Sequence, residues 1–97
     1  MMDFKGKVAV ITGAASGIGY GLAERCAREG MRVVMAGINE DNLKKAEKEI
    51  KKIGAETFVV QTDVSKREDV ENLAEKTIEK LGKVHLLFNN AGVYRHS

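Results

Sequence analysis

Residues 8–19 read Val-Ala-Val-Ile-Thr-Gly-Ala-Ala-Ser-Gly-Ile-Gly, and this stretch decides the fold. Val8 to Ile11 form a continuous apolar run of strand length, which is typical of a central parallel strand covered on both faces. Glycines follow at positions 13, 17 and 19, and from Ile18 onward apolar residues recur at helical spacing. A strand, a glycine-rich turn and a helix in this order predict the first unit of an α/β fold.

The same alternation continues along the chain. We expect further strands over 32–36, 57–60 and 84–88, and helices that end at Gly30, Gly54 and Gly82. Asn39 is placed to cap the second helix, and Ser65 with Glu68 forms a capping box for the third. Since the connections are short and crossovers between parallel strands are right-handed, the order β-α-β-α-β-α-β predicts a Rossmann-like, doubly wound parallel sheet.

The apolar spacing also predicts which helix faces are buried. For the first helix we expect Ile18, Leu22 and Cys26 to face the sheet, because they lie four residues apart. The second helix presents its own apolar residues on one face, opposite a row of lysines. The third helix has a wider predicted face, made of Val70, Leu73, Ala74, Thr77, Ile78 and Leu81.

Length and composition narrow the class of protein. The 97 residues include 43% hydrophobic residues, 16 Lys and Arg and 14 Asp and Glu, which predicts one globular domain over 1–97. The lysines alternate with glutamates, so they do not form the basic surface patch that is typical of nucleic-acid-binding proteins. No apolar run approaches the ~20 residues of a membrane span. The single cysteine, Cys26, indicates a reducing compartment, and we expect the protein in the cytoplasm.

The glycine-rich turn has the arrangement that binds a nucleotide. Gly13 permits a tight turn, Gly17 lets the backbone approach a pyrophosphate, and Gly19 allows the helix to pack closely on the strand. The Ser16 hydroxyl is placed to donate to a phosphate or a ribose, and the free N–H groups of the helix start face the anion. Scattered glycines can also be turn residues only. The strand before them and the helix after them favour nucleotide binding.

Two more strand ends carry polar residues that fit this interpretation. Asp63 and Val64 follow the third strand, where the carboxylate can accept from an adenine amino group while the valine packs on the ring. Asp63 is equally plausible as a turn aspartate ahead of a helix. Asn89-Asn90-Ala91-Gly92 follows the fourth strand. We expect all three stretches at one edge of the sheet.

At these separations, Thr12 to Gly19, Asp63-Val64 and Asn89 to Gly92 resemble the short-chain dehydrogenase/reductase family, and the resemblance runs from about Lys5 to Gly92. The family uses NAD or NADP to transfer hydride to or from alcohols and carbonyl compounds. The resemblance implies cofactor contacts, at the pyrophosphate from Gly13, Ser16, Ile18 and Gly19, at the adenine from Asp63 and Val64, and along the cleft from Asn90, Ala91 and Gly92.

The end of the second strand departs from both cofactor patterns of the family. Gly37, which we expect to let the backbone turn after the second strand, is also a candidate cofactor-binding position. NAD-specific members carry Asp where this chain has Gly37, and NADP-specific members carry a basic residue in place of Ile38 or Ser16. We favour NAD, because a 2′-phosphate without a cation is the worse fit. Asn39 and Asp41 are candidates to replace the missing carboxylate, but Asn39 fits better as the helix cap.

The catalytic residues of the family are missing from the sequence. Its catalytic Ser and Tyr-x-x-x-Lys pair lie beyond position 97, and neither Tyr20 nor Tyr94 has Lys four residues later. We therefore assign neither a catalytic nor a metal-binding residue. The chain is predicted to be a truncated, cofactor-binding half of a short-chain dehydrogenase. The alternative is a non-catalytic nucleotide-binding or self-associating module.

The fourth strand predicts an uncovered sheet edge. In the complete fold of the family further strands and helices flank it, so in this chain Leu86, Leu87 and Phe88 are expected to lie exposed. Apolar strand edges pair with other chains. We therefore expect a homo-oligomer that associates through the fourth strand or the third helix.

Overall fold

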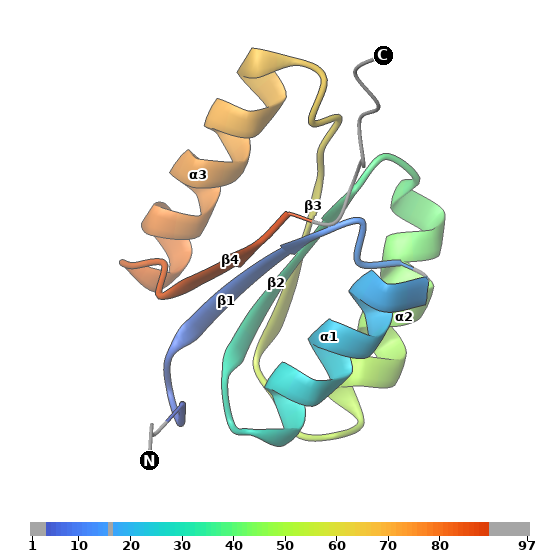
Figure 1. Cartoon of the computed structure of the whole chain (residues 1–97), viewed down its shortest axis with the longest axis vertical. Helices are drawn as coiled ribbons and strands as arrows, with labels where there is room; N and C mark the ends of the chain where they lie inside the picture. Colours follow the sequence, from blue (N-terminus) through green and yellow to red (C-terminus); the bar gives the residue numbers. More distant parts are fainter. Residues whose placement is uncertain (1–3, 16, 90–97) are drawn as a thin grey trace.

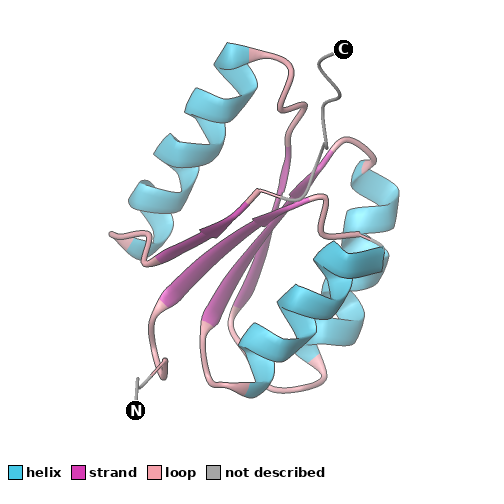
Figure 2. Ribbon diagram, viewed as in Figure 1, coloured by secondary structure: helices cyan, strands magenta, loops and turns pink. Residues whose placement is uncertain are grey.

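The computed structural model describes residues 4–15 and 17–89. Within them the strands and helices alternate, as β1 (Val8–Thr12), α1 (Gly17–Arg28), β2 (Arg32–Gly37), α2 (Glu40–Lys51), β3 (Thr57–Gln61), α3 (Arg67–Leu81) and β4 (Leu86–Phe88). The strands pair in parallel, in the order β3-β2-β1-β4. Helices α1 and α2 cover one face of the sheet and α3 covers the other (Figures 1 and 2). The predicted Rossmann-like fold is confirmed.

Strand β1 is central in the sheet, and all five of its residues are buried. Ala9 and Ile11 pack into the apolar layer under α1 and α2, whereas Val8 and Val10 pack into the layer under α3. The alternation arises because successive side chains of a strand point to opposite faces. With both faces covered, both sets are apolar, which explains the continuous apolar run in the sequence.

Helix α1 contacts the sheet through small side chains. Its buried residues are Gly19, Ala23, Cys26 and Ala27. Ile18 is 74% exposed, so the prediction that it faces the sheet is wrong. In the first turn of α1 the buried residue is its neighbour Gly19. The small residues bring the helix axis close to the strands, which leaves no place in the contact for a large side chain at the first turn.

Helix α2 begins as predicted from the sequence. The Asn39 side-chain oxygen accepts a hydrogen bond from the backbone N–H of Asn42 at 3.0 Å, so the predicted cap is confirmed. This contact satisfies one of the donors that a helix start leaves unpaired. Acidic and basic side chains one turn apart then pair along the exposed face, as Glu40–Lys44 at 3.9 Å and Glu47–Lys51 at 3.3 Å.

Helix α3 begins differently from the prediction. Its N-cap is Lys66, which makes no side-chain cap hydrogen bond, so the predicted capping box of Ser65 and Glu68 is wrong. The Ser65 hydroxyl and backbone N–H both donate to Asp63 Oδ1, at 2.6 and 2.9 Å. The helix begins one residue later than the box requires, and the Ser65 backbone N–H that would donate to Glu68 donates to the Asp63 carboxylate instead. Ser65 is therefore part of the turn that precedes the helix.

The buried face of α3 is narrower than predicted. Leu73, Thr77 and Leu81 are buried, on a single stripe four residues apart. The flanking residues of the predicted face are exposed; they are Val70, Ala74 and Ile78. Within residues 4–15 and 17–89, α3 is the one helix on its face of the sheet, so no second helix packs against this flank.

The residue before β4 is joined to β1 by two hydrogen bonds. The His85 backbone N–H donates to the Val8 carbonyl at 2.9 Å, and the Val8 N–H donates to His85 Nδ1 at 2.9 Å. Nδ1 can accept this bond only while it carries no proton. Desolvation, together with the charges of Lys7, Lys83 and Arg32, lowers the pKa of His85 below its ordinary value of 6.5.

This geometry predicts that stability rises with pH. Between the lowered pKa of native His85 and 6.5, the unfolded chain binds more protons than the native chain. The contribution of His85 is therefore fully present above pH 6.5 and is lost as the pH falls toward the native pKa. Urea unfolding of the wild type and of His85→Phe at several pH values measures the contribution of His85 to the free energy of unfolding. We expect the wild type to lose more stability than the variant on acidification; equal losses would contradict the assignment.

Candidate functional site

The carboxyl ends of the parallel strands lie at one edge of the sheet (Figure 1). At this edge the chain leaves β1 into the glycine-rich loop, β2 into α2, β3 into the turn at Asp63, and β4 into Asn89. In open α/β sheets, ligands bind in the crevice outside this edge, where the strand order reverses. In this sheet the order reverses at β1, because β2 lies on one side of it and β4 on the other.

The glycine-rich loop turns sharply between β1 and α1. Gly13 and Gly17 have positive φ angles of 62° and 59°, which other residues rarely adopt. The Ala14 N–H donates to the Ala36 carbonyl at 3.2 Å and so ties the loop to β2. Gly19 is buried against the sheet. The predicted tight turn at Gly13 and the close approach of the helix at Gly19 are therefore confirmed.

The start of α1 is exposed and has no acidic neighbour in its own first turn. A Cβ atom added to Gly17 would meet no atom within 4 Å, and the first turn of the helix contains no Asp or Glu. The unpaired N–H groups and the positive end of the helix dipole are thus available to an anion. Ile18 projects beside them into solvent. Ser16 lies outside the described residues.

A buried hydroxyl joins the ends of β1 and β4. Thr12 Oγ1 donates to Asn89 Oδ1 at 3.0 Å and also lies 3.3 Å from the Phe88 carbonyl oxygen. This contact positions Asn89 at the edge, next to the glycine-rich loop. Asn89 was not among the predicted cofactor contacts; its place directly after an apolar strand is the signal that could have singled it out. Asn90, Ala91 and Gly92 lie outside the described residues.

The turn after β3 is built around Asp63. Its carboxylate accepts both hydrogen bonds from Ser65, and these bonds hold the pKa of Asp63 below its ordinary value. Its backbone N–H donates to Asp69 Oδ2 at 2.9 Å. The alternative role of Asp63 as a turn residue is therefore confirmed. Beside it, Ile38, Gln61, Asp63, Lys66 and Asp69 line a hollow of about 340 Å³, and Val64 is half-buried.

The end of β2 is crowded at Gly37. Gly37 pairs with Gln61 within the sheet and its φ is not positive, so the predicted backbone turn at this glycine is wrong. A Cβ atom at this position would lie 3.3 Å from Cδ2 of Leu43, which is fully buried. A side chain here would require Leu43 to shift by a few tenths of an ångström. Ile38, 67% exposed, follows, and its carbonyl accepts from Gln61 Nε2 at 2.9 Å.

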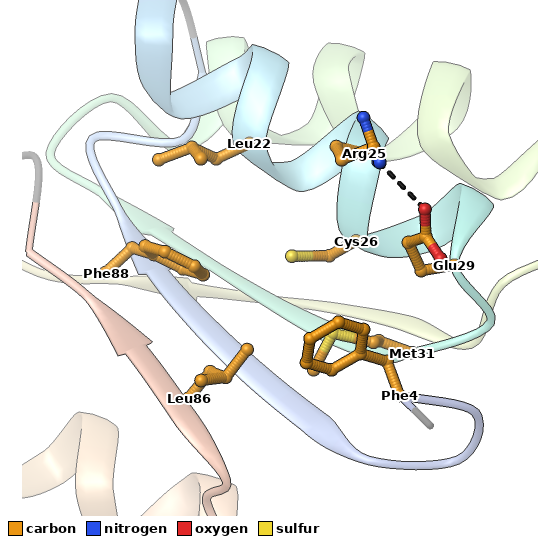
Figure 3. Close-up of a pocket in the computed structure, with 8 residues that line it drawn as sticks. All are labelled: Phe4, Leu22, Arg25, Cys26, Glu29, Met31, Leu86 and Phe88. Atoms are coloured by element: carbon orange, nitrogen blue, oxygen red, sulfur yellow. Dashed lines mark hydrogen bonds and ion pairs between the residues drawn. The ribbon is translucent and has the colours of Figure 1, made fainter. Parts of the chain in front are cut away.

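A larger hollow, about 600 Å³, lies on the face of α1 beside β4 (Figure 3). Its polar groups are the side chains of Arg25 and Glu29, which pair with each other at 2.9 Å. The remaining lining is apolar or weakly polar, made of Phe4, Leu22, Cys26, Met31, Leu86 and Phe88. Burial raises the pKa of the Cys26 thiol. This surface offers no unpaired cation or helix start to a phosphate.

The described residues contain no group of three or more metal-ligating side chains. None of the helices described here is long and apolar enough to cross a membrane. The sequence as a whole matches the family described as short chain dehydrogenase over residues 7–97.

The chain belongs to this family.

Two bacterial relatives match most of this chain. A CLA biosynthesis dehydrogenase/reductase of Lactiplantibacillus plantarum is 45% identical over 93 residues, and the alignment covers 96% of this chain and 32% of the relative. A diacetyl reductase [(S)-acetoin forming] of Staphylococcus epidermidis is 42% identical over 87 residues, covering 90% of this chain and 34% of the relative. The chain therefore spans about a third of the length of the short chain dehydrogenases it matches.

Solved structures agree with this assignment. A short chain dehydrogenase of Burkholderia phymatum, in complex with NAD, superposes with a TM-score of 0.91 at 50% identity, over 96% of this chain and 33% of that one. The L-sorbose reductase of Gluconobacter frateurii, complexed with NADPH and L-sorbose, gives a TM-score of 0.90 at 38% identity, over 99% of this chain and 38% of that one. The predicted family is confirmed, and the chain matches a portion of such a protein.

Proposed function

We propose that residues 1–97 form one nucleotide-binding unit that holds a nicotinamide dinucleotide. The observation that carries the proposal is the exposed start of α1 at Gly17, without an acidic residue in its first turn, at the edge where open α/β sheets bind ligands. The proposed contacts fall into three groups: Gly13, Ser16, Gly17, Ile18 and Gly19 at the pyrophosphate, Asp63 and Val64 at the adenine, and Asn90, Ala91 and Gly92 along the cleft.

The proposed adenine contact is compatible with the turn role of Asp63. Ser65 bonds to Oδ1, and a carboxylate has four lone-pair positions, so acceptor capacity remains for an adenine amino group. The lowered pKa keeps the carboxylate ionised and therefore accepting only. Gly37 leaves the ribose hydroxyls without a carboxylate partner, and the absence of a basic residue at positions 16 and 38 favours NAD over NADP.

In a longer member of the family, such a unit would present the nicotinamide to an alcohol or carbonyl compound for hydride transfer. The cofactor supplies that chemistry, and the protein binds and orients it. The chain described here would hold the dinucleotide, without the family's Ser and Tyr-x-x-x-Lys for proton transfer.

The test is a titration of the purified 97-residue chain with NADH and with NADPH, followed by nicotinamide fluorescence. Saturable binding is the expected result. A chain that is folded by circular dichroism and binds neither nucleotide would contradict the proposal. That outcome would favour the alternative, a self-associating module in which the glycine-rich loop serves the architecture only.

We also propose that the chain self-associates through β4. This strand is at the edge of the described sheet, has three residues, and leaves Leu87 64% exposed. An unpaired apolar strand edge is a template for another chain. Sedimentation at high concentration is expected to show a dimer or larger species, and Leu87→Lys is expected to shift it toward monomer.

Ile78→Lys is the matched control for the edge, because Ile78 is an exposed apolar residue of α3. If Ile78→Lys dissociates the oligomer and Leu87→Lys does not, the chains associate through α3 instead of β4. A wild-type chain that sediments as a monomer at every concentration would contradict association through either β4 or α3.

A further inference from the structure

One edge of β4 has no partner strand among the described residues. The order β3-β2-β1-β4 places β4 at the end of the sheet, with β1 on its inner side (Figure 1). Along such an edge strand, successive residues alternate between bonding the inner neighbour and presenting their N–H and C=O groups outward. The hydrogen bonds of β1 determine which residue of β4 presents its groups outward.

This residue is Leu87. The Lys7 carbonyl accepts from β2, and the Val8 carbonyl accepts from the residue that precedes β4. Because successive strand residues direct their backbone groups to opposite edges, the even-numbered residues of β1 face β4. Val10 is one of them, and it pairs in register with Leu87. In a parallel ladder such a residue bonds the two neighbours of its partner. Leu87 therefore directs its own N–H and C=O away from β1.

The side chains of β4 are apolar on both faces of this edge. Leu86 and Phe88 lie on the face of α1, where they line the hollow of about 600 Å³ (Figure 3). Leu87 points to the opposite face and is 64% exposed. An antiparallel strand centred on Leu87 would meet apolar side chains on both faces, and such cross-strand pairs stabilise a sheet.

Charge argues against α3 as the surface where two copies meet. Glu75 and Glu79 lie beside the exposed Ile78, around one shallow hollow of α3, and Glu71 lies one turn earlier. Within residues 4–15 and 17–89 these three glutamates enter no ion pair, whereas the glutamates of α1 and α2 are paired. Two copies of this flank around a two-fold axis would oppose acid to acid, which is unfavourable.

The β4 edge has no such conflict. Residues 86–89 carry no charge, and the nearest preceding cation is Lys83. In an antiparallel pair centred on Leu87, the two copies of Lys83 lie ~27 Å apart, at the rise of a strand residue. Like charges therefore do not oppose each other across this edge.

Resting on the proposed self-association of the chain, we propose that two copies pair through β4 as antiparallel strands, with Leu87 on the two-fold axis. An interface around such an axis must be self-complementary. The β4 edge meets this condition, because each Leu87 N–H donates to the partner's Leu87 carbonyl and Leu86 lies opposite the partner's Phe88. The two four-stranded sheets join into one, with both α1 helices on the same face.

The first experiment is oxidation of Leu87→Cys by copper phenanthroline in air, at a concentration where sedimentation shows association. Val84→Cys is the matched control, because Val84 is also exposed but lies three residues from the axis, so its two copies are ~20 Å apart. We expect Leu87→Cys to form the covalent dimer at least about tenfold faster, since a disulfide joins only Cα atoms within about 7 Å. The wild type controls for Cys26, which is buried.

The second experiment uses charge at the same position and needs no cross-link. Position 87 lies opposite itself only in the proposed register, so Leu87→Lys alone and Leu87→Glu alone are expected to sediment as monomers. Their equimolar mixture is expected to associate, because opposite charges then face each other across the strands.

The outcomes separate the geometry from self-association. Equal cross-linking of Val84→Cys and Leu87→Cys, cross-linking of Ile78→Cys in place of Leu87→Cys, or a mixture that stays monomeric would overturn the antiparallel β4 pair. An oligomer in which Leu87→Cys does not cross-link would overturn it too. In each case the wild type still associates, so the proposed self-association stands. A wild type that is a monomer at every concentration would overturn both.

Discussion

Replacing Gly17 with valine is expected to abolish saturable binding of NADH and NADPH. Gly17 has a φ of +59°, where a β-branched residue is strained by about 1–3 kcal/mol. Its Cβ position meets no protein atom within 4 Å, so a side chain there would occupy the space through which a pyrophosphate approaches the start of α1. The measurement is the fluorescence titration with both cofactors, on protein whose folding is checked by circular dichroism.

Gly21→Ala provides the control for this substitution. Gly21 lies one turn later in α1, its φ is not positive, and an added Cβ would also meet nothing within 4 Å. We expect it to bind as the wild type does and to be more stable by up to about 1 kcal/mol, because alanine is the better helix former. If Gly17→Val bound either cofactor as tightly as Gly21→Ala, the pyrophosphate would not lie at Gly17.

Ile11→Ala is expected to have the largest effect on stability. Ile11 is fully buried in the central strand, where it pairs in register with Met35 of β2 and Phe88 of β4. Truncating a buried isoleucine to alanine typically costs about 2–5 kcal/mol, from lost apolar burial and the cavity that remains. Domains of this size have about 5–15 kcal/mol in total, so the loss is a large fraction.

Urea unfolding of both proteins measures this loss as a lower midpoint at an unchanged slope. Ile38→Ala is the matched control, since Ile38 is exposed after β2, and its change should stay within about 0.5 kcal/mol. If the two variants lost the same free energy, the layer between the sheet and helices α1 and α2 would not be the stabilising core.

Local patterns predicted the fold well because each depends on neighbours in sequence. Three features depend only on residues close in sequence: the apolar run at β1, the positive φ of Gly13 and the Asn39 cap. Parallel order then follows from the alternation of strands and helices. The same information placed Asp63 at the carboxyl edge, although it could not decide between a turn and a ligand role.

The wrong predictions all depended on contacts that sequence spacing does not contain. Ile18 has helical spacing with Leu22, but the first turn of α1 buries Gly19 and leaves Ile18 exposed. Ser65 fits a capping box, yet the Asp63 carboxylate takes both of its donors. Gly37 resembles a turn glycine, whereas it continues β2, pairs with Gln61 and has no positive φ.

The residues of the candidate site also differ in whether local sequence patterns predict them. The glycine positions follow from the strand, turn and helix around them, whereas the contact of Thr12 with Asn89 joins opposite ends of the chain, 77 residues apart, and leaves no local signal. The roles of Ser16, Asn90, Ala91 and Gly92 rest on the family resemblance and on the proposed function.

The sheet order has a consequence for synthesis on the ribosome. Val8 pairs with Arg32 and Val33 with Thr57, but the other edge of β1 is paired with Leu86 to Phe88, which are translated much later. Chains fold from the amino end as they emerge, and distant pairings close last. A nascent chain that stalls before Leu86 therefore presents β1, whose five residues are all buried in the complete sheet, as an unpaired edge. Such an edge is a target for chaperones and for pairing between ribosome-bound copies.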